Sequence, residues 1–403
     1  MINTANFKTK TMFYQKNNES VEDTWVVALD IGYSSVKVIS NNADVVFPSY
    51  ARKIDSPLLN LGESNKTDIQ YRNNRTGELW AVGESAQNMI VTGETRDSIT
   101  ELYGRNRYFS DLFKVISEVG MGVGMIANSY GSPKGKKLLI QTGLPPAYLK
   151  SDSSLLKEAL AGDHSFSIKI GNSNWVTFDF SLTEEDISIM AQPMGTLFSI
   201  ATDNKGKTVP EAAKYFKSSV LIFDPGFGTL DVFNIRNRMI DSSETFDNLG
   251  MKRVFTETSN SILDKYHQEI SVPAMQKYLR TGEIKCRDRK TRSTTMAPFG
   301  ELLEEANKKV CMEALAKIDN IYNGLYDHDY LVITGGTGAA WEHIIREYYS
   351  GMETLKIIMG NQNDNLPCFF SNARGYYLYS VGRLKRKASK WLFYKKRLFI
   401  WKL

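Results

Sequence analysis

The chain has 403 residues, of which 42% are hydrophobic and 24% are charged. This length exceeds what one hydrophobic core usually supports, and the composition is that of a soluble globular protein, so two or three lobes are expected. The net charge of +5 does not by itself indicate direct DNA binding. The cysteines and histidines lie outside metal-binding spacings, which predicts free thiols and no zinc site.

The N-terminal residues 1–20 are polar and lack the apolar centre of a secretory signal, so we interpret them as a flexible leader. No apolar run in the sequence approaches the roughly 18–20 residues that cross a membrane. These features together predict a cytoplasmic protein.

Ordered structure is expected to begin near Trp25. Residues 25–29 (WVVAL) are a short apolar run, typical of a buried strand, and the run ends in Asp30 and Gly32. Residues 36–39 (VKVI) are predicted to return as the second strand of a hairpin.

Strand and helix patterns alternate after this hairpin. Residues 41–105 are polar and are interpreted as a smaller subdomain or a long insertion. Apolar periodicity then predicts a series of elements: helices at 107–119 and 151–160, strands at 137–142, 165–171, 175–182 and 187–190, and a helix from about 195.

The hairpin pattern restarts at residue 220. Residues 220–223 (VLIF) read as a buried strand ending in Asp224, and residues 230–235 return. A repeat after about 200 residues indicates two related lobes. Later elements follow the same logic: helices near 252–266, 273–280, 300–323 and 374–384, and strands at 330–333 and 354–359.

Three glycine-rich turns follow buried strands. In the two hairpins a carboxylate, Asp30 or Asp224, precedes small residues whose backbone N–H groups can approach an anion. Carboxylates do not bind phosphate, but they hold Mg²⁺ or its water ligands. Lys37 can reach a phosphate as a point charge. The third turn, residues 334–338 (TGGTG), precedes a predicted helix near Ala339 and lacks the lysine of a Walker loop.

The segments VVALDIGYSSVKV, LIFDPGFGTLDVF and LVITGGTGAAW resemble the two phosphate motifs and the adenosine motif of the superfamily of actins, sugar kinases and heat-shock chaperones. The resemblance spans about residues 25–384. The wording DIGYSSVK, the chain length, GLPPAYL and ARGYYLYSVG are most similar to the ParM group of plasmid-segregation filament proteins.

This resemblance implies an α/β, two-lobed actin-like ATPase fold with mixed sheets and a central nucleotide cleft. It divides the chain into domain I, residues 21–205 with 372–403 and a subdomain at about 41–105, and domain II, residues 206–371. The expected cofactors are ATP and Mg²⁺, and the sequence leaves GTP open.

The resemblance also implies residue roles. Asp30 and Asp224 would hold Mg²⁺ through water, and Gln192 would orient the attacking water. The implied nucleotide-binding residues come from both hairpins, the third turn and one further turn: Gly32, Tyr33, Ser34, Ser35, Lys37, Gly226, Phe227, Gly228, Thr229, Gly250, Gly335, Gly336, Thr337 and Gly338. Because Phe227 sits inside the phosphate turn, its ring is expected to point away from the phosphates.

The function implied by the resemblance is an ATP-dependent, head-to-tail filament that segregates plasmid DNA through an adaptor protein on a centromere-like site. We expect no direct DNA binding and no membrane partner. Alternatives left open are a small-molecule kinase, a chaperone-like ATPase, and a membrane-associated cell-division or cell-shape scaffold that would use the basic, aromatic residues 385–403.

Overall fold

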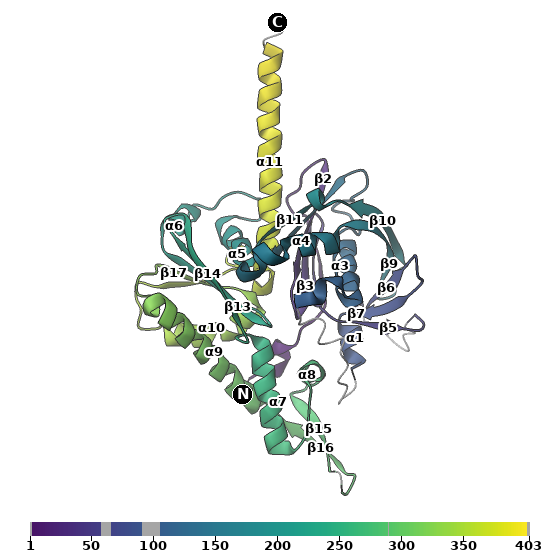
Figure 1. Ribbon diagram of the computed structural model, residues 1–403, viewed down its shortest axis with the longest axis vertical. Coiled ribbons are helices and arrows are strands. Elements are labelled where there is room, and N and C mark those ends of the chain that lie inside the picture. The colour runs from purple at the N-terminus through teal and green to yellow at the C-terminus, as the bar shows by residue number, and fades with distance from the viewer. Residues whose placement is uncertain (1, 58–65, 91–104, 289, 401–403) are drawn as a thin grey trace.

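The computed structural model describes residues 2–57, 66–90, 105–288 and 290–400. Figure 1 shows two lobes side by side, with the C-terminal helix α11 emerging between them. We call the lobe that contains β2 and β6 the first lobe and the lobe that contains β12 the second lobe. The prediction of an α/β, two-lobed fold with mixed sheets is confirmed.

The main sheet of the first lobe has six strands in the order β1-β4-β3-β2-β8-β11. β2 pairs antiparallel with β3 and parallel with β8, so the sheet is mixed. The strands are β1 (Met12–Gln15), β4 (Ala43–Pro48), β3 (Ser35–Ser40), β2 (Thr24–Ile31), β8 (Lys137–Leu144) and β11 (Ile187–Ala191).

Both faces of this sheet are covered by helices. Val27 and Leu29 of β2 belong to the core shared with α3 (Asp111–Val123), whereas Val26 and Ala28 face the residues of α11 (Ser371–Ile400). Successive side chains of a strand point to opposite faces, so the continuous apolar run of β2 serves two cores at once.

A second, antiparallel sheet completes the first lobe. Its order is β10-β9-β6-β7-β5, with β10 (Val176–Leu182), β9 (Gly162–Ile170), β6 (Ile69–Asn73), β7 (Leu79–Val82) and β5 (Ala51–Ile54). The predicted subdomain at 41–105 therefore has different limits. β4 lies within the predicted subdomain but pairs with β3 and belongs to the main sheet. β9 lies outside the predicted range but pairs with β6 and belongs to the second sheet. Residues 58–65 and 91–104 lie outside the described residues.

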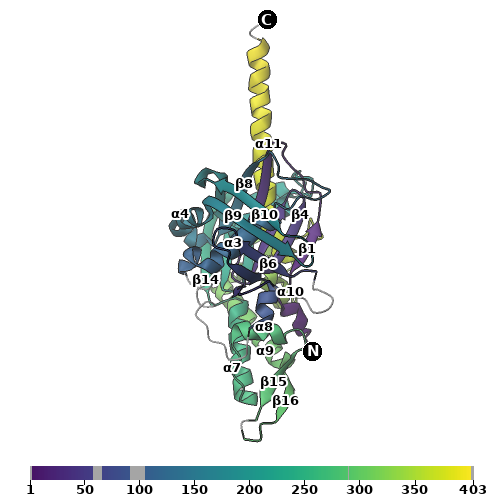
Figure 2. The same cartoon turned by 90° about the vertical axis from the view of Figure 1, so that its right-hand side faces the viewer.

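The second lobe is built on the sheet β14-β13-β12-β17-β18. Its strands are β14 (Met239–Asp247), β13 (Thr229–Arg236), β12 (Val220–Pro225), β17 (Tyr330–Ile333) and β18 (Lys356–Met359). Helices α7 (Met251–Tyr266), α9 (Gly300–Tyr322) and α10 (Gly335–Tyr348) share the largest core of the molecule with it. A small hairpin, β15 (Glu283–Arg287) and β16 (Thr294–Pro298), lies at the far end (Figure 2).

The shorter helices connect these layers. They are α1 (Glu84–Asn88), α4 (Leu149–Leu160), α5 (Gln192–Ala201), α6 (Ala212–Lys217) and α8 (Val272–Tyr278), with 3-10 turns at Thr4–Phe7, Arg105–Phe109, Pro146–Tyr148, Glu184–Asp186, Asn323–Leu325 and Cys368–Phe370. The three cysteines are free thiols, as predicted.

The expectation of a flexible leader is wrong for residues 2–20. Residues Thr4–Phe7 form a 3-10 turn, and β1 pairs antiparallel with β4 at the edge of the main sheet. Phe7 is buried in the core of the second lobe. The polar composition did not indicate an ordered segment. A few apolar side chains are enough to fix it, because they pack against the edge of the main sheet and the core of the second lobe.

Helix α11 begins before and ends beyond the predicted range of 374–384. Its first part crosses α5 so closely that a Cβ on Gly375 would lie 1.6 Å from the carbonyl oxygen of Gly195. The remainder projects beyond both lobes (Figures 1 and 2). None of the helices in the described part of the chain combines the length and the hydrophobicity needed to span a bilayer.

A buried histidine links the stability of the second lobe to pH. His328 is 3% exposed, and its Nε2 lies 3.1 Å from Oδ1 of Asn234. Burial first, and then the charge of Arg236, lower the pKa of His328 to about 4. The unfolded chain therefore takes up a proton at higher pH than the native one, and stability falls as pH drops from about 6.5 towards 4.

We expect His328→Gln to flatten this acid dependence, which amounts to on the order of 1–3 kcal/mol near pH 4.5. Urea unfolding at pH 7 and pH 4.5 measures it. The parent protein, measured at the same two pH values, gives the reference slope. An equal slope in the His328→Gln variant would contradict the prediction.

Candidate functional site

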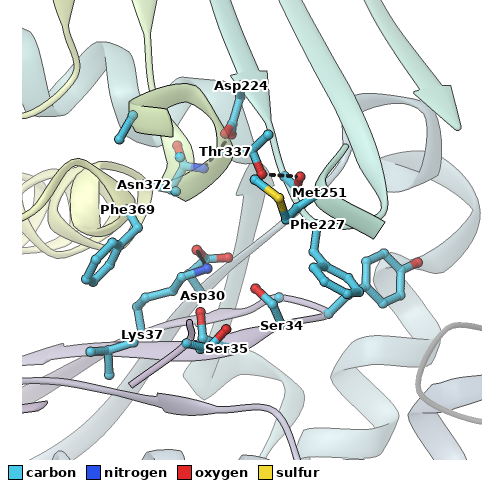
Figure 3. A pocket seen from close by; sticks show the side chains of 18 of the residues that line it. Asp30, Ser34, Ser35, Lys37, Asp224, Phe227, Met251, Thr337, Phe369 and Asn372 are labelled. Carbon is cyan, nitrogen blue, oxygen red and sulfur yellow. Dashed lines mark hydrogen bonds and ion pairs between the residues drawn. The ribbon is translucent and has the colours of Figure 1, made fainter. Parts of the chain in front are cut away.

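A cavity of about 510 Å³ lies between the two lobes. Figure 3 shows Asp30 and Lys37 rising from one side and Asp224 pointing in from the other. The cavity brings together most of the residues proposed from the sequence: Asp30, Gly32, Tyr33, Ser34, Ser35, Lys37, Gln192, Asp224, Gly226, Phe227, Thr229, Gly335, Gly336 and Thr337.

The first hairpin pairs a carboxylate with a lysine. Asp30 of β2 and Lys37 of β3 are opposite each other in the antiparallel register, and Lys37 Nζ lies 3.1 Å from Asp30 Oδ2. The turn between the strands is closed by the Gly32 N–H, which donates to the Ser35 carbonyl oxygen at 3.1 Å. A Cβ on Gly32 would lie 3.1 Å from Lys37 Nζ, so glycine leaves the lysine room beside the turn.

The second hairpin has the same register but a different partner. Asp224 of β12 is opposite Asp231 of β13, seven residues later, which is also the spacing between Asp30 and Lys37. Asp231 lines the cavity but is not among the residues predicted from the sequence. The equal spacing within the two repeats was the signal that could have found it.

Burial shapes the charges of this pair. It raises the pKa of Asp224 to about 6 and that of Asp231 to about 8, and neighbouring carboxylates add to both shifts. Thr245 Oγ1 donates to Asp231 Oδ1 at 2.7 Å and partly offsets the effect. Carboxylates that burial makes costly to ionise gain most from a bound cation.

Asn372 is a second functional candidate that is not among the residues predicted from the sequence. It stands in the first turn of α11, and its Nδ2 donates to Asp224 Oδ2 at 2.7 Å. Its own Oδ1 accepts from Thr196 Oγ1 of α5 at 2.8 Å. These bonds fix the orientation of the Asp224 carboxylate. The local sequence does not reveal them, because the three residues meet only in the folded chain.

The glycine-rich segment 335–338 forms the first turn of α10 and not a loop preceding a helix at Ala339. Gly335 has φ +76°, and a Cβ there would lie 2.8 Å from Asp224 Oδ1. Thr337 Oγ1 donates to the Gly226 carbonyl oxygen at 2.8 Å. The N-terminus of α10 therefore opens onto the cavity next to Asp224, a position suited to an anion.

Three of the proposed nucleotide-binding glycines, Gly228, Gly250 and Gly338, are not among the described residues that line the cavity. They allow close packing behind its walls. A Cβ on Gly228 would lie 2.9 Å from the Tyr33 ring, and one on Gly250 would lie 2.6 Å from the Gly226 carbonyl oxygen. Glycine is needed at these positions because they pack closely against the turns that line the cavity.

Phe227 and Gln192 also lie at the cavity. The Phe227 ring centroid is 6.1 Å from that of Phe255, and Figure 3 shows the ring apart from the carboxylates of Asp30 and Asp224. Gln192 is half-buried at the first position of α5, directly after β11.

The site fits a nucleotide carried with a hydrated divalent cation. Asp30 and Asp224 offer oxygen atoms, and the first turn of α10 offers backbone donors, whereas the N–H groups of Gly32 and Gly226 close their own turns by donating to the Ser35 and Thr229 carbonyl oxygens. Among the described residues no three His, Cys, Asp or Glu side chains converge into a metal cage. The two carboxylates would suit Mg²⁺, which keeps several water ligands and needs few carboxylates.

The contact between Gly335 and Asp224 leads to a prediction. Gly335→Ala should lower the free energy of unfolding by about 1–3 kcal/mol, because the new methyl group meets a buried carboxylate and the backbone has positive φ. Urea unfolding measures the loss. In the neighbouring control, Gly336→Ala, the nearest atom would be 3.8 Å away, and stability should change by less than about 0.5 kcal/mol. Equal effects of the two substitutions would contradict this assignment.

Comparisons with known proteins agree with this architecture. Residues 28–195 match the family model of the actin-like proteins N-terminal domain. No curated protein matches the sequence. A non-polymerisable quadruple mutant of pCBH ParM has a TM-score of 0.68 and 20% identity, covering 89% of this chain and 99% of its own.

Two further solved structures are similar. A 15-stranded ParM filament from Clostridium botulinum has a TM-score of 0.66 and 21% identity, covering 88% of this chain and 98% of its own. An archaeal actin homologue in complex with ADP has a TM-score of 0.58 and 16% identity, covering 89% and 99%. The chain therefore has the fold of ParM and the other actin-like proteins, and its residues 28–195 form an actin-like N-terminal domain.

Proposed function

We propose that this protein binds ATP with Mg²⁺ in the cavity between its lobes, hydrolyses it, and assembles into head-to-tail filaments that segregate plasmid DNA. The observation that carries the proposal is that Asp30 and Asp224, which end equivalent strands of the two hairpins, line one shared cavity. The similarity to a ParM filament and to an actin homologue bound to ADP supports it.

Different residues of the cavity are proposed to bind different parts of the ligand. Asp30 and Asp224 would hold water ligands of the cation, and Asp231 lies opposite Asp224 on the neighbouring strand. Backbone N–H groups of the two turns and the N-terminus of α10 hold the phosphates. Lys37, paired with Asp30, adds a positive charge within reach of them. When bound, Mg²⁺ would neutralise charge on the phosphate oxygens.

Gln192 is the proposed positioning group for the attacking water. A glutamine side chain does not act as a strong base, but its amide can hold water in line with the terminal phosphate. Its place at the first position of α5 fixes its backbone, since a helix supported by α11 is more rigid than a loop.

Filament formation follows from the same geometry. A ligand that touches both lobes stabilises the arrangement in which both contacts are made, and hydrolysis removes part of that stabilisation. Repeated head-to-tail contacts that do not close into a ring produce an open filament. An adaptor protein bound to a centromere-like DNA site would couple this cytoplasmic filament to a plasmid.

Substitutions should separate cation binding from hydrolysis. Asp224→Asn should abolish Mg²⁺-dependent ATP binding, because it removes a charge that faces the cation. Gln192→Ala should leave ATP affinity within a few-fold but slow hydrolysis about 100-fold. Calorimetry and phosphate release measure these effects, with the exposed Asp264→Asn as the control. Turnover that requires a small-molecule acceptor would instead identify a kinase.

Assembly is tested separately by sedimentation. With ATP or GTP and Mg²⁺, the wild-type protein at roughly tens of micromolar, a concentration range in which association is commonly probed, should pellet and show filaments by electron microscopy. Asp224→Asn should remain in the supernatant. Nucleotide turnover without any nucleotide-dependent polymer would contradict the filament proposal while leaving the ATPase proposal in place.

A further inference from the structure

The N-terminal segment, residues 2–16, runs from one lobe to the other beside the cavity. On the second lobe, Thr4 Oγ1 donates to the Leu279 carbonyl oxygen at 2.6 Å, and the Thr9 N–H donates to Gln276 Oε1 at 3.1 Å. Phe7, between them, is buried in the core of that lobe. Residues 4–9 are therefore attached at three points to the second lobe.

The next residues are attached to the first lobe. Lys8 Nζ lies 2.9 Å from Glu84 Oε1, and the Thr11 N–H donates to Glu84 Oε2 at 2.8 Å. The side chains of Lys8 and Glu84 are only 11% and 16% exposed, so this pair is less screened by solvent than a surface ion pair. β1 then joins the edge of the main sheet by pairing with β4. The chain thus crosses from lobe to lobe within about three residues.

The crossing segment also forms part of the cavity wall. Asn6, Phe7, Lys8, Thr9 and Lys10 line the same cavity as Asp30 and Asp224. None of them belongs to the region matched by the actin-like N-terminal domain, which begins at residue 28.

The wall beside this segment differs chemically from the carboxylate end. Met251 and Phe255 of α7 line the cavity and share a hydrophobic core with Phe7, and Gln276 of α8 lines it as well. A nucleotide has a charged end and a flat, largely apolar end that carries a few polar groups. With its phosphates and their cation at the end that carries Asp30 and Asp224, its base would extend towards Met251 and Phe255.

Resting on the nucleotide binding proposed above, we infer that residues 6–10 contact the nucleoside and act as a strap that must detach before nucleotide is released. The strap holds the two lobes at the nucleoside end, so widening the cleft breaks its contacts with Glu84 on one side or with Gln276 and the Phe7 pocket on the other. Nucleotide exchange is therefore controlled by residues outside the two phosphate turns.

The test measures release of a fluorescent N-methylanthraniloyl-ADP from the full-length protein, chased with excess unlabelled ADP. Glu84→Ala and Gln276→Ala each detach one end of the strap, and each should accelerate release about ten-fold. Glu78→Ala is the matched control, because Glu78 pairs with Lys53 within the first lobe and touches no part of the strap. Its release rate should equal that of the wild type.

Photolabelling tests the contact itself. An 8-azido-ADP probe should attach to residues 6–10, as located by mass spectrometry, and unlabelled ADP should compete. Labels confined to α7 and α10, or unchanged release in both detached variants with melting temperatures near that of the wild type, would overturn the strap while nucleotide binding stands. Failure of the wild-type protein to bind either analogue would overturn the proposed function, and the strap with it.

Discussion

The central feature of the structure is a group of carboxyl side chains that are buried between the two lobes and are only partly neutralised by a lysine. Asp30, Asp224 and Asp231 are each 5% exposed or less, and Lys37 forms an ion pair with the first of them. Burial makes ionisation of the other two costly, as their raised pKa values show. A hydrated cation would relieve this cost, and the phosphates that accompany it would meet the backbone donors of both turns. Binding of the phosphates would thus be strengthened by a bound cation.

The two hairpins are related but not equivalent. The same register places Lys37 opposite Asp30 in the first lobe and Asp231 opposite Asp224 in the second. One hairpin therefore carries an ion pair, whereas the other carries two buried carboxyl groups with raised pKa values, which accept hydrogen bonds from Asn372 and from neighbouring threonines.

The lobes are joined by packing that small residues make possible. Helices α5 and α11 cross where Gly375 meets Gly195, and any side chain at Gly375 would collide with the backbone of α5. Close to this crossing, Thr196 and Asn372 connect α5 and α11 to Asp224. The position of the Asp224 carboxylate is consequently coupled to the contact between two helices from distant parts of the chain.

Local patterns in the sequence determined the strands, the acidic turns and their repeat, because a buried strand needs apolar residues and a tight turn needs glycine wherever they occur. The contacts of Asn372, the packing role of Gly250 and the course of residues 2–16 were decided only by the tertiary structure. Each of these depends on a partner far away in sequence, such as Glu84 for Lys8 or Asp224 for Asn372. Periodicity describes how a segment folds by itself and carries no information about which distant surface it will meet.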